Sequence, residues 1–394
     1  LDLGYAPPSN AYLSCEDLNS PEVYLPLRVV VCHSCWLVQT EDYAEADSLF
    51  KDDYAYFSST STSFLRHAES YCAGITERLS LSPNSFVIEV ASNDGYLLQN
   101  FVEAGVPCLG VEPTRDTARA ARNLGIEVLE EFFSETVARA LVDQGKSADL
   151  VIGNNVYAHV PDINDFTKGL AALLKPQGVI TLEFPHALQL IANNQFDTIY
   201  HEHFSYLSLT AVLSIFEDAG LRVWDVDELP THGGSIRVYG CLKGAKFEET
   251  PAVDRVLKNE VRAGLSSPDA YLAFQAQAES VKYELLEFLL AAKRKGKSIA
   301  AYGAAAKGNT LLNYAGVKTD LIPYVCDAAS AKQGKFLPGS HIPIASPDRL
   351  ISDSLDYILV LPWNLIDEVA GQLAEITSRG TKLVTAIPSL KILD

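Results

Sequence analysis

The sequence predicts an α/β protein built on parallel sheets, and three features indicate this class. Short apolar runs alternate with amphipathic segments from about residue 64 to residue 245, as in a parallel sheet covered by helices. A second series of the same kind fills residues 298–394. The 394 residues are also enough for two or three domains, each with its own hydrophobic core.

The composition argues against several classes of protein. Lys and Arg number 31 against 50 Asp and Glu, and the net charge is −19. Nucleic acids and anionic membranes both need a basic surface, so neither is expected as a partner. No apolar run approaches the roughly 20 residues that span a bilayer, and residues 1–10 lack the pattern of a secretion signal. We therefore expect a cytoplasmic protein. Methionine is absent, so the chain is expected to begin inside the natural protein.

The central region predicts one sheet that ends in a hairpin. Its expected strands are 86–91, 108–112, 150–153 and 179–184, with a turn at 174–178 before the last of them. A helix at about 209–219 is followed by two more strands, 222–227 and 235–241. These two are joined by Pro-Thr-His-Gly-Gly and are expected to pair antiparallel, closing the sheet.

Polar residues follow three of these strands and predict a cofactor site. The first strand runs into a tight turn and then a helix at 96–104, whose backbone N–H groups would point at a ligand. Glu112 ends the second strand, where a carboxylate can accept hydrogen bonds from both hydroxyls of a ribose. The predicted cofactor residues are Glu89, Ser92, Asn93, Asp94, Gly95, Glu112, Asn154 and Asn155.

The regions on either side of the central one differ from it in composition and in the elements they predict. Residues 1 to about 60 are rich in Pro, Tyr, Ser and Asp and contain one Cys-x-x-Cys. Residues 268–295 predict one long helix, and strands are expected near 298–302, 322–326, 357–361 and 382–386. We predict an N-terminal module at 1–62, a central domain at 63–245, a helical connector at 246–297 and a C-terminal domain at 298–394.

Five motifs resemble one family of enzymes, the sugar C-3 methyltransferases that act on TDP-linked ketosugars in antibiotic pathways. The motifs are Ala-Ser-Asn-Asp-Gly-Tyr (91–96), Glu-Phe-Pro-His (183–186), Tyr-His-Glu-His-Phe-Ser-Tyr (200–206), Pro-Thr-His-Gly-Gly-Ser (230–235) and Lys-Gly-Asn-Thr-Leu-Leu (307–312). The resemblance covers the whole chain. It implies an N-terminal zinc-binding module, a class I (Rossmann-like) methyltransferase domain and a C-terminal Rossmann-like domain, with the active site between the last two.

The resemblance also implies two bound groups. One is S-adenosylmethionine, which the predicted cofactor residues would hold. The other is a structural zinc ion, which the family binds with two Cys-x-x-Cys pairs. Only Cys32 and Cys35 remain here, and the other pair is expected to lie upstream of this chain. Because structural zinc needs four ligands, the module is truncated relative to the family, and the alternative is two reduced cysteines in a loop.

Carbon methylation of a sugar needs an acidic C–H, which a 4-keto sugar provides at C-3 through an enolate. The enzyme must then supply a base, a donor for the enolate oxygen and close alignment of the two substrates. His203 is the predicted base, since imidazole exchanges protons near neutral pH. Glu202 would orient or polarise it, and Tyr200 would donate to the oxyanion. The resemblance implies these roles at the matching positions.

Further residues are predicted to contact the nucleotide-linked ketosugar. The resemblance implies a tyrosine near the sugar, Tyr56 or else Tyr54, although an aromatic plug between domains is the alternative. The small-residue loop before the helix at 306 suits a diphosphate, although it is not a P-loop. With simple packing as the alternative for the histidines, the predicted substrate residues are Tyr56, Tyr54, His186, His232, Lys307, Asn309 and Lys332.

Three other functions are weighed against this one. The acceptor could be another activated ketosugar or enolisable metabolite. The C-terminal unit could serve an NAD-dependent sugar-modifying enzyme, but it lacks Gly-x-Gly-x-x-G and a clear acidic ribose partner. A nonenzymatic binding module would leave the Tyr-His-Glu-His cluster without a use. A monomer is expected.

Overall fold

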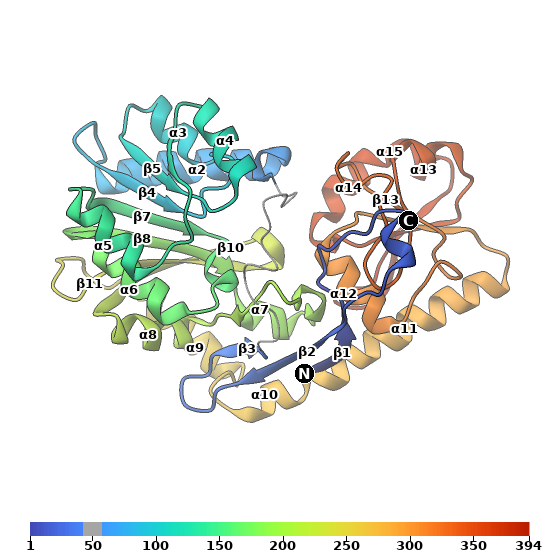
Figure 1. The fold of residues 1–394 in the computed structure, drawn as a ribbon. Coiled ribbons are helices and arrows are strands. Elements are labelled where there is room, and N and C mark those ends of the chain that lie inside the picture. The colour runs from blue at the N-terminus through green and yellow to red at the C-terminus, as the bar shows by residue number, and fades with distance from the viewer. Residues whose placement is uncertain (42–56, 394) are drawn as a thin grey trace.

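The computed structural model describes residues 1–41 and 57–393, and in these residues the strands form three sheets. Figure 1 shows a central sheet covered by helices, a second α/β unit beside it, and a small N-terminal sheet that runs along the long helix α11. Tyr54 and Tyr56 lie outside the described residues. The predicted α/β class is confirmed.

The central sheet has seven strands in the order β10-β11-β8-β7-β4-β5-β6. The strands are β4 (Val87–Val90), β5 (Cys108–Val111), β6 (Glu127–Leu129), β7 (Ala148–Asn154), β8 (Leu174–Pro185), β10 (Leu221–Leu229) and β11 (Ser235–Leu242). Strands β4, β5, β6, β7 and β8 run parallel. Strand β11 lies between β8 and β10 and is antiparallel to both. The expected antiparallel hairpin is therefore present.

Helices cover this sheet on both faces (Figure 1). They are α2 (Thr62–Leu79), α3 (Leu98–Glu103), α4 (Arg115–Asn123), α5 (Glu135–Asp143), α6 (Ile163–Leu173), α8 (Leu209–Asp218) and α9 (Pro251–Arg262). The expected turn at 174–178 is wrong, because these residues begin β8. Leu174 pairs with Ala148, and the register shifts before Val179 pairs with Leu150. Gly178 fits this close approach because a Cβ there would lie 2.7 Å from the carbonyl oxygen of Ala148.

The C-terminal sheet has six strands in the order β14-β13-β12-β15-β16-β17, parallel except for β17. The strands are β12 (Ile299–Tyr302), β13 (Val325–Cys326), β14 (Ile344–Ala345), β15 (Tyr357–Val360), β16 (Lys382–Thr385) and β17 (Lys391–Leu393). The expected strand at 322–326 is too long, because the amide of Ile322 closes a turn onto Lys318 and Pro323 has no N–H to donate. Four helices belong here: α12 (Ala306–Ala315), α13 (Asp348–Ser352), α14 (Ile366–Gln372) and α15 (Ala374–Ser378).

The expected long helix is divided into α10 (Pro268–Leu272) and α11 (Phe274–Arg294). The division is slight, since Ala273 between them keeps helical dihedral angles. No described helix is both long and apolar enough to cross a membrane.

The N-terminal sheet consists of β1 (Asp2–Ala6), β2 (Leu25–Val31), β3 (Val38–Thr40) and β9 (Ser205–Tyr206), in that order. Its last strand comes from the central region and follows the Tyr-His-Glu-His motif directly, with Val38 opposite Tyr206. Buried side chains of β1 and β2 share one hydrophobic core with α11 and the C-terminal sheet. The motif is therefore held by the N-terminal sheet as well as by its own domain.

Candidate active site

His203 is held by hydrogen bonds to both ring nitrogens. Its Nδ1 lies 2.8 Å from the carbonyl oxygen of Thr198, and its Nε2 lies 2.9 Å from the hydroxyl of Tyr200. A carbonyl can only accept, so Nδ1 carries the proton and Nε2 accepts the hydrogen bond from Tyr200. The side chain of Thr40, at the end of β3, donates to the carbonyl of His203 itself.

The surroundings keep this imidazole neutral. Burial lowers the pKa of His203 well below its usual value, and the neighbouring His159 and Lys307 lower it further. The rings of His159 and His203 meet edge to face with centroids 4.5 Å apart. Burial also lowers the pKa of His159 to about 4, and its Nδ1 is 2.8 Å from the carbonyl of Glu202. The sequence analysis did not name His159 as a site residue.

Glu202 is buried with 2% of its surface exposed. The side-chain amide of Asn10 donates to its Oε2 at 2.6 Å. The hydroxyl of Tyr12 reaches Asn10 at 3.3 Å and donates to the carbonyl of Ala304 at 2.6 Å. The N-terminal segment thus joins Glu202 to the C-terminal domain, a contact that the predicted motifs did not indicate.

The predicted cofactor residues come together at the carboxyl ends of β4, β5 and β7. Ala91, Asn93 and Gly95 have positive φ angles, which form the tight turn. Glu112 accepts from the backbone N–H groups of Asn93 and Thr114, each at 2.9 Å. Several buried polar atoms face no partner among the described residues: Glu89 Oε2, Ser92 Oγ, Asp94 Oδ1, Asn154 Oδ1 and Asn155 Oδ1.

These unpartnered atoms fit a polar ligand at this edge. Buried oxygens without a hydrogen-bond partner are costly unless something binds them. Burial, with Glu112 and Asp94 close by, raises the pKa of Glu89 well above its usual value. The backbone amide of Ser58 donates to the side chain of Asn93, and that of Ser59 donates to the side chain of Asp94, each at 3.0 Å.

Glu183, at the end of β8, forms a buried cluster that sequence reasoning missed. His67 Nε2 lies within 2.9 Å of both carboxylate oxygens, and Arg237 and Thr231 also bond to this carboxylate. Although burial alone would raise it, His67 and Arg237 hold the pKa of Glu183 below its usual value. The sequence feature that could have indicated this cluster is Glu183 itself, because it begins the Glu-Phe-Pro-His motif.

The contacts of His186 favour the alternative of simple packing. Its Nε2 lies 2.7 Å from Glu260 Oε1, and both side chains are 1% exposed. Glu260 also accepts from the backbone amides of Leu209 and Thr210 at the start of α8. The imidazole is therefore engaged by a helix-capping carboxylate, and packing is the better interpretation of this residue.

His232 and Lys307 approach the His203 cluster from two further elements. His232 lies in the short turn η5 (Thr231–Gly233) with a positive φ of 55°, and its Nε2 is buried with no partner in the described chain. Burial, with Lys307 nearby, lowers the pKa of His232 to about 4. Lys307 donates to Asn364 at 3.0 Å and lies 4.8 Å from the ring centre of Trp363. Burial lowers the pKa of Lys307 as well.

Asn309 lies in the first turn of α12, and Lys332 contacts the loop between β12 and α12. The side chain of Asn309 is buried and donates to the carbonyl of Ser9 at 2.5 Å, while its Oδ1 has no partner in the described chain. Lys332 donates to the carbonyl of Ala304 at 3.0 Å. Asp327, directly after β13, accepts from the amide of Ala304 at 2.7 Å. This acidic residue at a strand end was not singled out from the sequence.

Cys32 and Cys35 lie in the turn between β2 and β3. Hydrogen bonds from the amides of Cys35 and Ser34 lower the pKa of the Cys32 thiol, while burial raises that of Cys35. Within residues 1–41 and 57–393, no three metal-binding side chains come together. The described chain thus offers two thiols, which do not by themselves complete a four-ligand zinc site.

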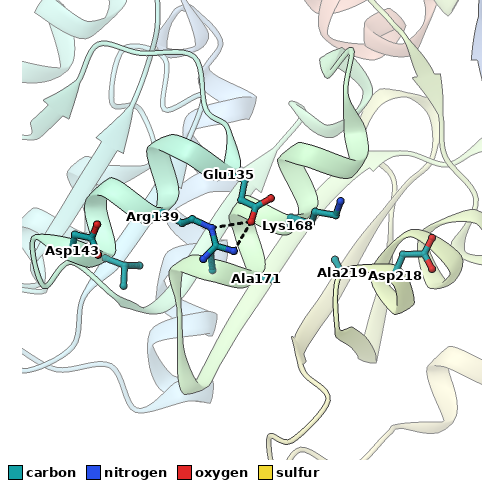
Figure 2. A pocket seen from close by; sticks show the side chains of 9 residues that line it. Glu135, Arg139, Asp143, Lys168, Ala171, Asp218 and Ala219 are labelled. Carbon is teal, nitrogen blue, oxygen red and sulfur yellow. Dashed lines mark hydrogen bonds and ion pairs between the residues drawn. The ribbon is translucent and has the colours of Figure 1, made fainter.

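A surface hollow lies between α5, α6 and the end of α8 (Figure 2). Its charged side chains include the ion pair of Arg139 with Glu135, which Figure 2 marks with dashed lines. None of the predicted site residues lines it.

Three family models match the chain in sequence order. Residues 1–50 match one described as "Putative zinc binding domain", residues 64–226 a "Methyltransferase domain", and residues 230–388 a "C-methyltransferase C-terminal domain".

Individual proteins are also similar. The C-methyltransferase NovU of Streptomyces niveus is 36% identical over 393 residues, which cover 100% of this chain and 93% of NovU. A ubiquinone biosynthesis O-methyltransferase of Bartonella tribocorum is 29% identical over 133 residues, 32% of this chain and 51% of that protein. Among solved structures, the YcgJ protein of Bacillus subtilis covers 45% of this chain and 98% of its own, at 13% identity and a TM-score of 0.37.

Proposed function

Because this chain belongs to the family of S-adenosylmethionine-dependent C-methyltransferases, we propose that it transfers a methyl group to C-3 of a nucleotide-linked 4-keto-6-deoxy sugar. The nucleotide is TDP and the route is an enolate. In this proposal the enzyme serves the synthesis of a deoxysugar, as in an antibiotic pathway.

One observation supports the proposal: a neutral, buried imidazole whose Nε2 carries no proton and shares a hydrogen bond with a tyrosine. The contact of His203 Nδ1 with Thr198 leaves Nε2 as the proton acceptor. Tyr200 supplies a hydroxyl at 2.9 Å from that nitrogen. A base and an acid within one hydrogen bond are what enolisation of a ketone requires.

The proposed reaction has two stages. Tyr200 turns its hydroxyl from His203 to the C-4 oxygen of the sugar, which frees the lone pair of Nε2. His203 takes the C-3 proton, and the electrons of that C–H bond form the enolate, whose oxygen accepts from Tyr200. The enolate carbon would then be the nucleophile for the methyl group that S-adenosylmethionine supplies when it is bound. His203 finally releases its proton to solvent.

When bound, S-adenosylmethionine supplies an electrophilic methyl carbon on a positively charged sulfur. We propose that the turn from Ser92 to Gly95 holds it, with Glu112 at the ribose hydroxyls. The support is the set of buried polar atoms of this turn that lack partners in the described chain. Glu89, Asn154 and Asn155 would line the same edge.

For the nucleotide-sugar, we propose contacts on the C-terminal side. Lys332, beside the amino end of α12, is the candidate for the diphosphate. Lys307, Asn309 and His232 would line the sugar end, since His232 and Lys307 both influence the pKa of His203. Tyr56 or Tyr54, outside the described residues, remains the proposed tyrosine near the sugar.

The test is mass spectrometry of TDP-4-keto-2,6-dideoxyglucose incubated with the enzyme and S-adenosylmethionine in heavy water. A gain of one CH2 on the sugar is expected. Deuterium uptake at C-3 without methylation would support the base and point to a different acceptor. No change in mass would remove this sugar from the proposal, and calorimetry with S-adenosylmethionine and with NAD would show whether the cofactor is the expected one.

A further inference from the structure

The short helix η4 (Phe196–Thr198) lies in the central region of the chain but packs into another core. Phe196 is fully buried and Ile199 is 1% exposed, and both belong to the hydrophobic cluster built by α11, α12 and the C-terminal sheet. The ring of Phe196 lies 5.5 Å from that of Tyr314 on α12. The segment just before the Tyr-His-Glu-His motif is thus seated on the C-terminal domain.

Two hydrogen bonds from the C-terminal domain fix this segment. The hydroxyl of Thr310 donates to the carbonyl of Ile199 at 2.8 Å. The indole N–H of Trp363 donates to Oδ2 of Asp197 at 2.7 Å. Asp197 has no exposed surface, and its Oδ1 has no partner in the described chain. Because this carboxylate is buried, it depends strongly on each partner that it has, and Lys307 is a charged neighbour as well.

Trp363 sits where three loops meet. Its ring packs on Gly233, where a Cβ would lie 2.5 Å from the ring, and Lys307 lies over its face. Gly233 and Lys307 belong to two of the motifs singled out from the sequence, whereas Trp363 belongs to none of them. The indole therefore joins the glycine pair, the lysine loop and η4 at one point.

Thr198 lies between the two anchored residues and provides the carbonyl that bonds His203 Nδ1 at 2.8 Å. The direction of this carbonyl decides which ring nitrogen of His203 carries the proton. If η4 rotates, Nε2 can become the protonated nitrogen and is then no longer a base.

We propose that Trp363 is a positioning residue: through Asp197 and η4 it fixes the tautomer of His203, so that the base is competent only when the C-terminal domain is seated against η4. The inference rests on the proposed role of His203 as the base. Neither Trp363 nor Asp197 touches the reacting atoms in this proposal.

The first test replaces the indole N–H while keeping an aromatic ring. In Trp363→Phe of the full chain, kcat should fall by about 10-fold to 100-fold, as for other residues that orient a functional histidine. The KM for S-adenosylmethionine should stay within about twofold of its original value, an estimate based on the intact cofactor turn. In ¹⁵N-histidine NMR spectra without substrate, the His203 signals should move from the Nδ1–H pattern toward the Nε2–H pattern.

The partner residue allows a double-mutant cycle. Asp197→Ala should cause the same losses as Trp363→Phe, and the double variant should be no worse than either single one, because all three break the same link. Asp197→Asn keeps an oxygen that can accept from the indole, so it should lose much less activity than Asp197→Ala. If Trp363→Phe does not fold, this pair of Asp197 variants carries the test.

Trp224→Phe is the matched control, because the Trp224 N–H has no hydrogen-bond partner in the described chain and its ring stacks on Phe247. It should change neither kcat nor the His203 spectrum. Additive losses in the cycle, or an unchanged His203 spectrum in Trp363→Phe, would overturn the inference. If the spectrum responds but the ketosugar is not methylated even by the unaltered enzyme, the proposed substrate fails while the link to His203 stands.

Discussion

At the scale of single residues, His203 is distinguished by having both ring nitrogens engaged by groups of different chemistry. A carbonyl fixes the proton on Nδ1, and a tyrosine hydroxyl marks Nε2 as the acceptor. By contrast, the side chain of His341 is 43% exposed, and its Nε2 pairs with Glu22.

His203→Ala should therefore reduce methyl transfer by at least about 100-fold, the contribution typical of a general base. Binding of S-adenosylmethionine, measured by calorimetry, should stay nearly unchanged because the predicted cofactor turn follows β4 and does not include His203. His341→Asn is the control and should leave kcat unchanged. Near-normal turnover of His203→Ala would refute the assignment of the base.

The pH dependence should reflect the lowered pKa of His203. Burial and nearby cations disfavour the protonated imidazole, so the base form persists below the ordinary pKa of about 6.5. The acid limb of kcat/KM should thus lie below pH 6.5. Lys307→Met removes one of the cations and should raise the pKa of His203, which moves the acid limb to higher pH. A limb at or above pH 6.5 in the unaltered enzyme would contradict this account.

At the scale of elements, α8 and α9 are joined by one buried carboxylate. Glu260 on α9 accepts from His186 and from the first amides of α8. Because these donors are buried, they would be left unpaired without it. His186 therefore links secondary-structure elements, whereas Glu183 of the same motif bonds to His67 and Arg237.

Glu260→Ala should destabilise the protein by about 3–5 kcal/mol, the cost of leaving a buried charged or polar partner unpaired. The change should appear as a lowered midpoint of thermal unfolding. Asp254→Ala is a control in the same helix, since the pair of Asp254 with Lys258 is exposed and worth at most about 0.5 kcal/mol. Equal effects of the two substitutions would show that the Glu260 cluster does not stabilise this junction.

At the scale of the whole molecule, the proposed site draws on all parts of the described chain. Asn10 reaches Glu202 from the N-terminal segment, and Trp363 reaches Asp197 from the C-terminal domain. The predicted domain boundaries at 62, 245 and 297 remain proposals. They take no account of η4, which lies just before the motif at 200–206, or of β9, which lies within it, although both pack against the other two regions.

TDP and S-adenosylmethionine are proposed to bind to different domains, so a substitution at one site should change the affinity for only one of them. Lys332→Ala should weaken TDP binding by about 10-fold, as expected for the loss of a hydrogen bond from a charged group, and should leave the affinity for S-adenosylmethionine unchanged. Calorimetry with each ligand measures both. Lys297→Ala is the control, because Lys297 precedes β12 at the opposite edge of the same sheet and pairs with Asp356. Unchanged TDP affinity in Lys332→Ala would exclude this lysine from the nucleotide site.

The sequence by itself determined the fold class, the enzyme family and most of the strands of the two α/β units. Strands 108–112 and 357–361 were predictable because buried parallel strands are continuous apolar runs, which is a local property. The turn at 92–95 was predictable for the same reason, since a strand, polar turn and helix follow one another directly. The boundary of β8 was not, because pairing of Leu174 with Ala148 is a contact between distant residues.

Only the tertiary structure decided which side chains meet. His67 and Arg237 lie 116 and 54 residues from Glu183 along the chain, and Trp363 lies 166 residues from Asp197. No local pattern encodes such pairs, because they arise when separate elements are packed together. The same packing brought His186 against Glu260 and His159 against His203. Residue types and spacing select the chemistry, while burial and the partners at each atom decide which residues can perform it.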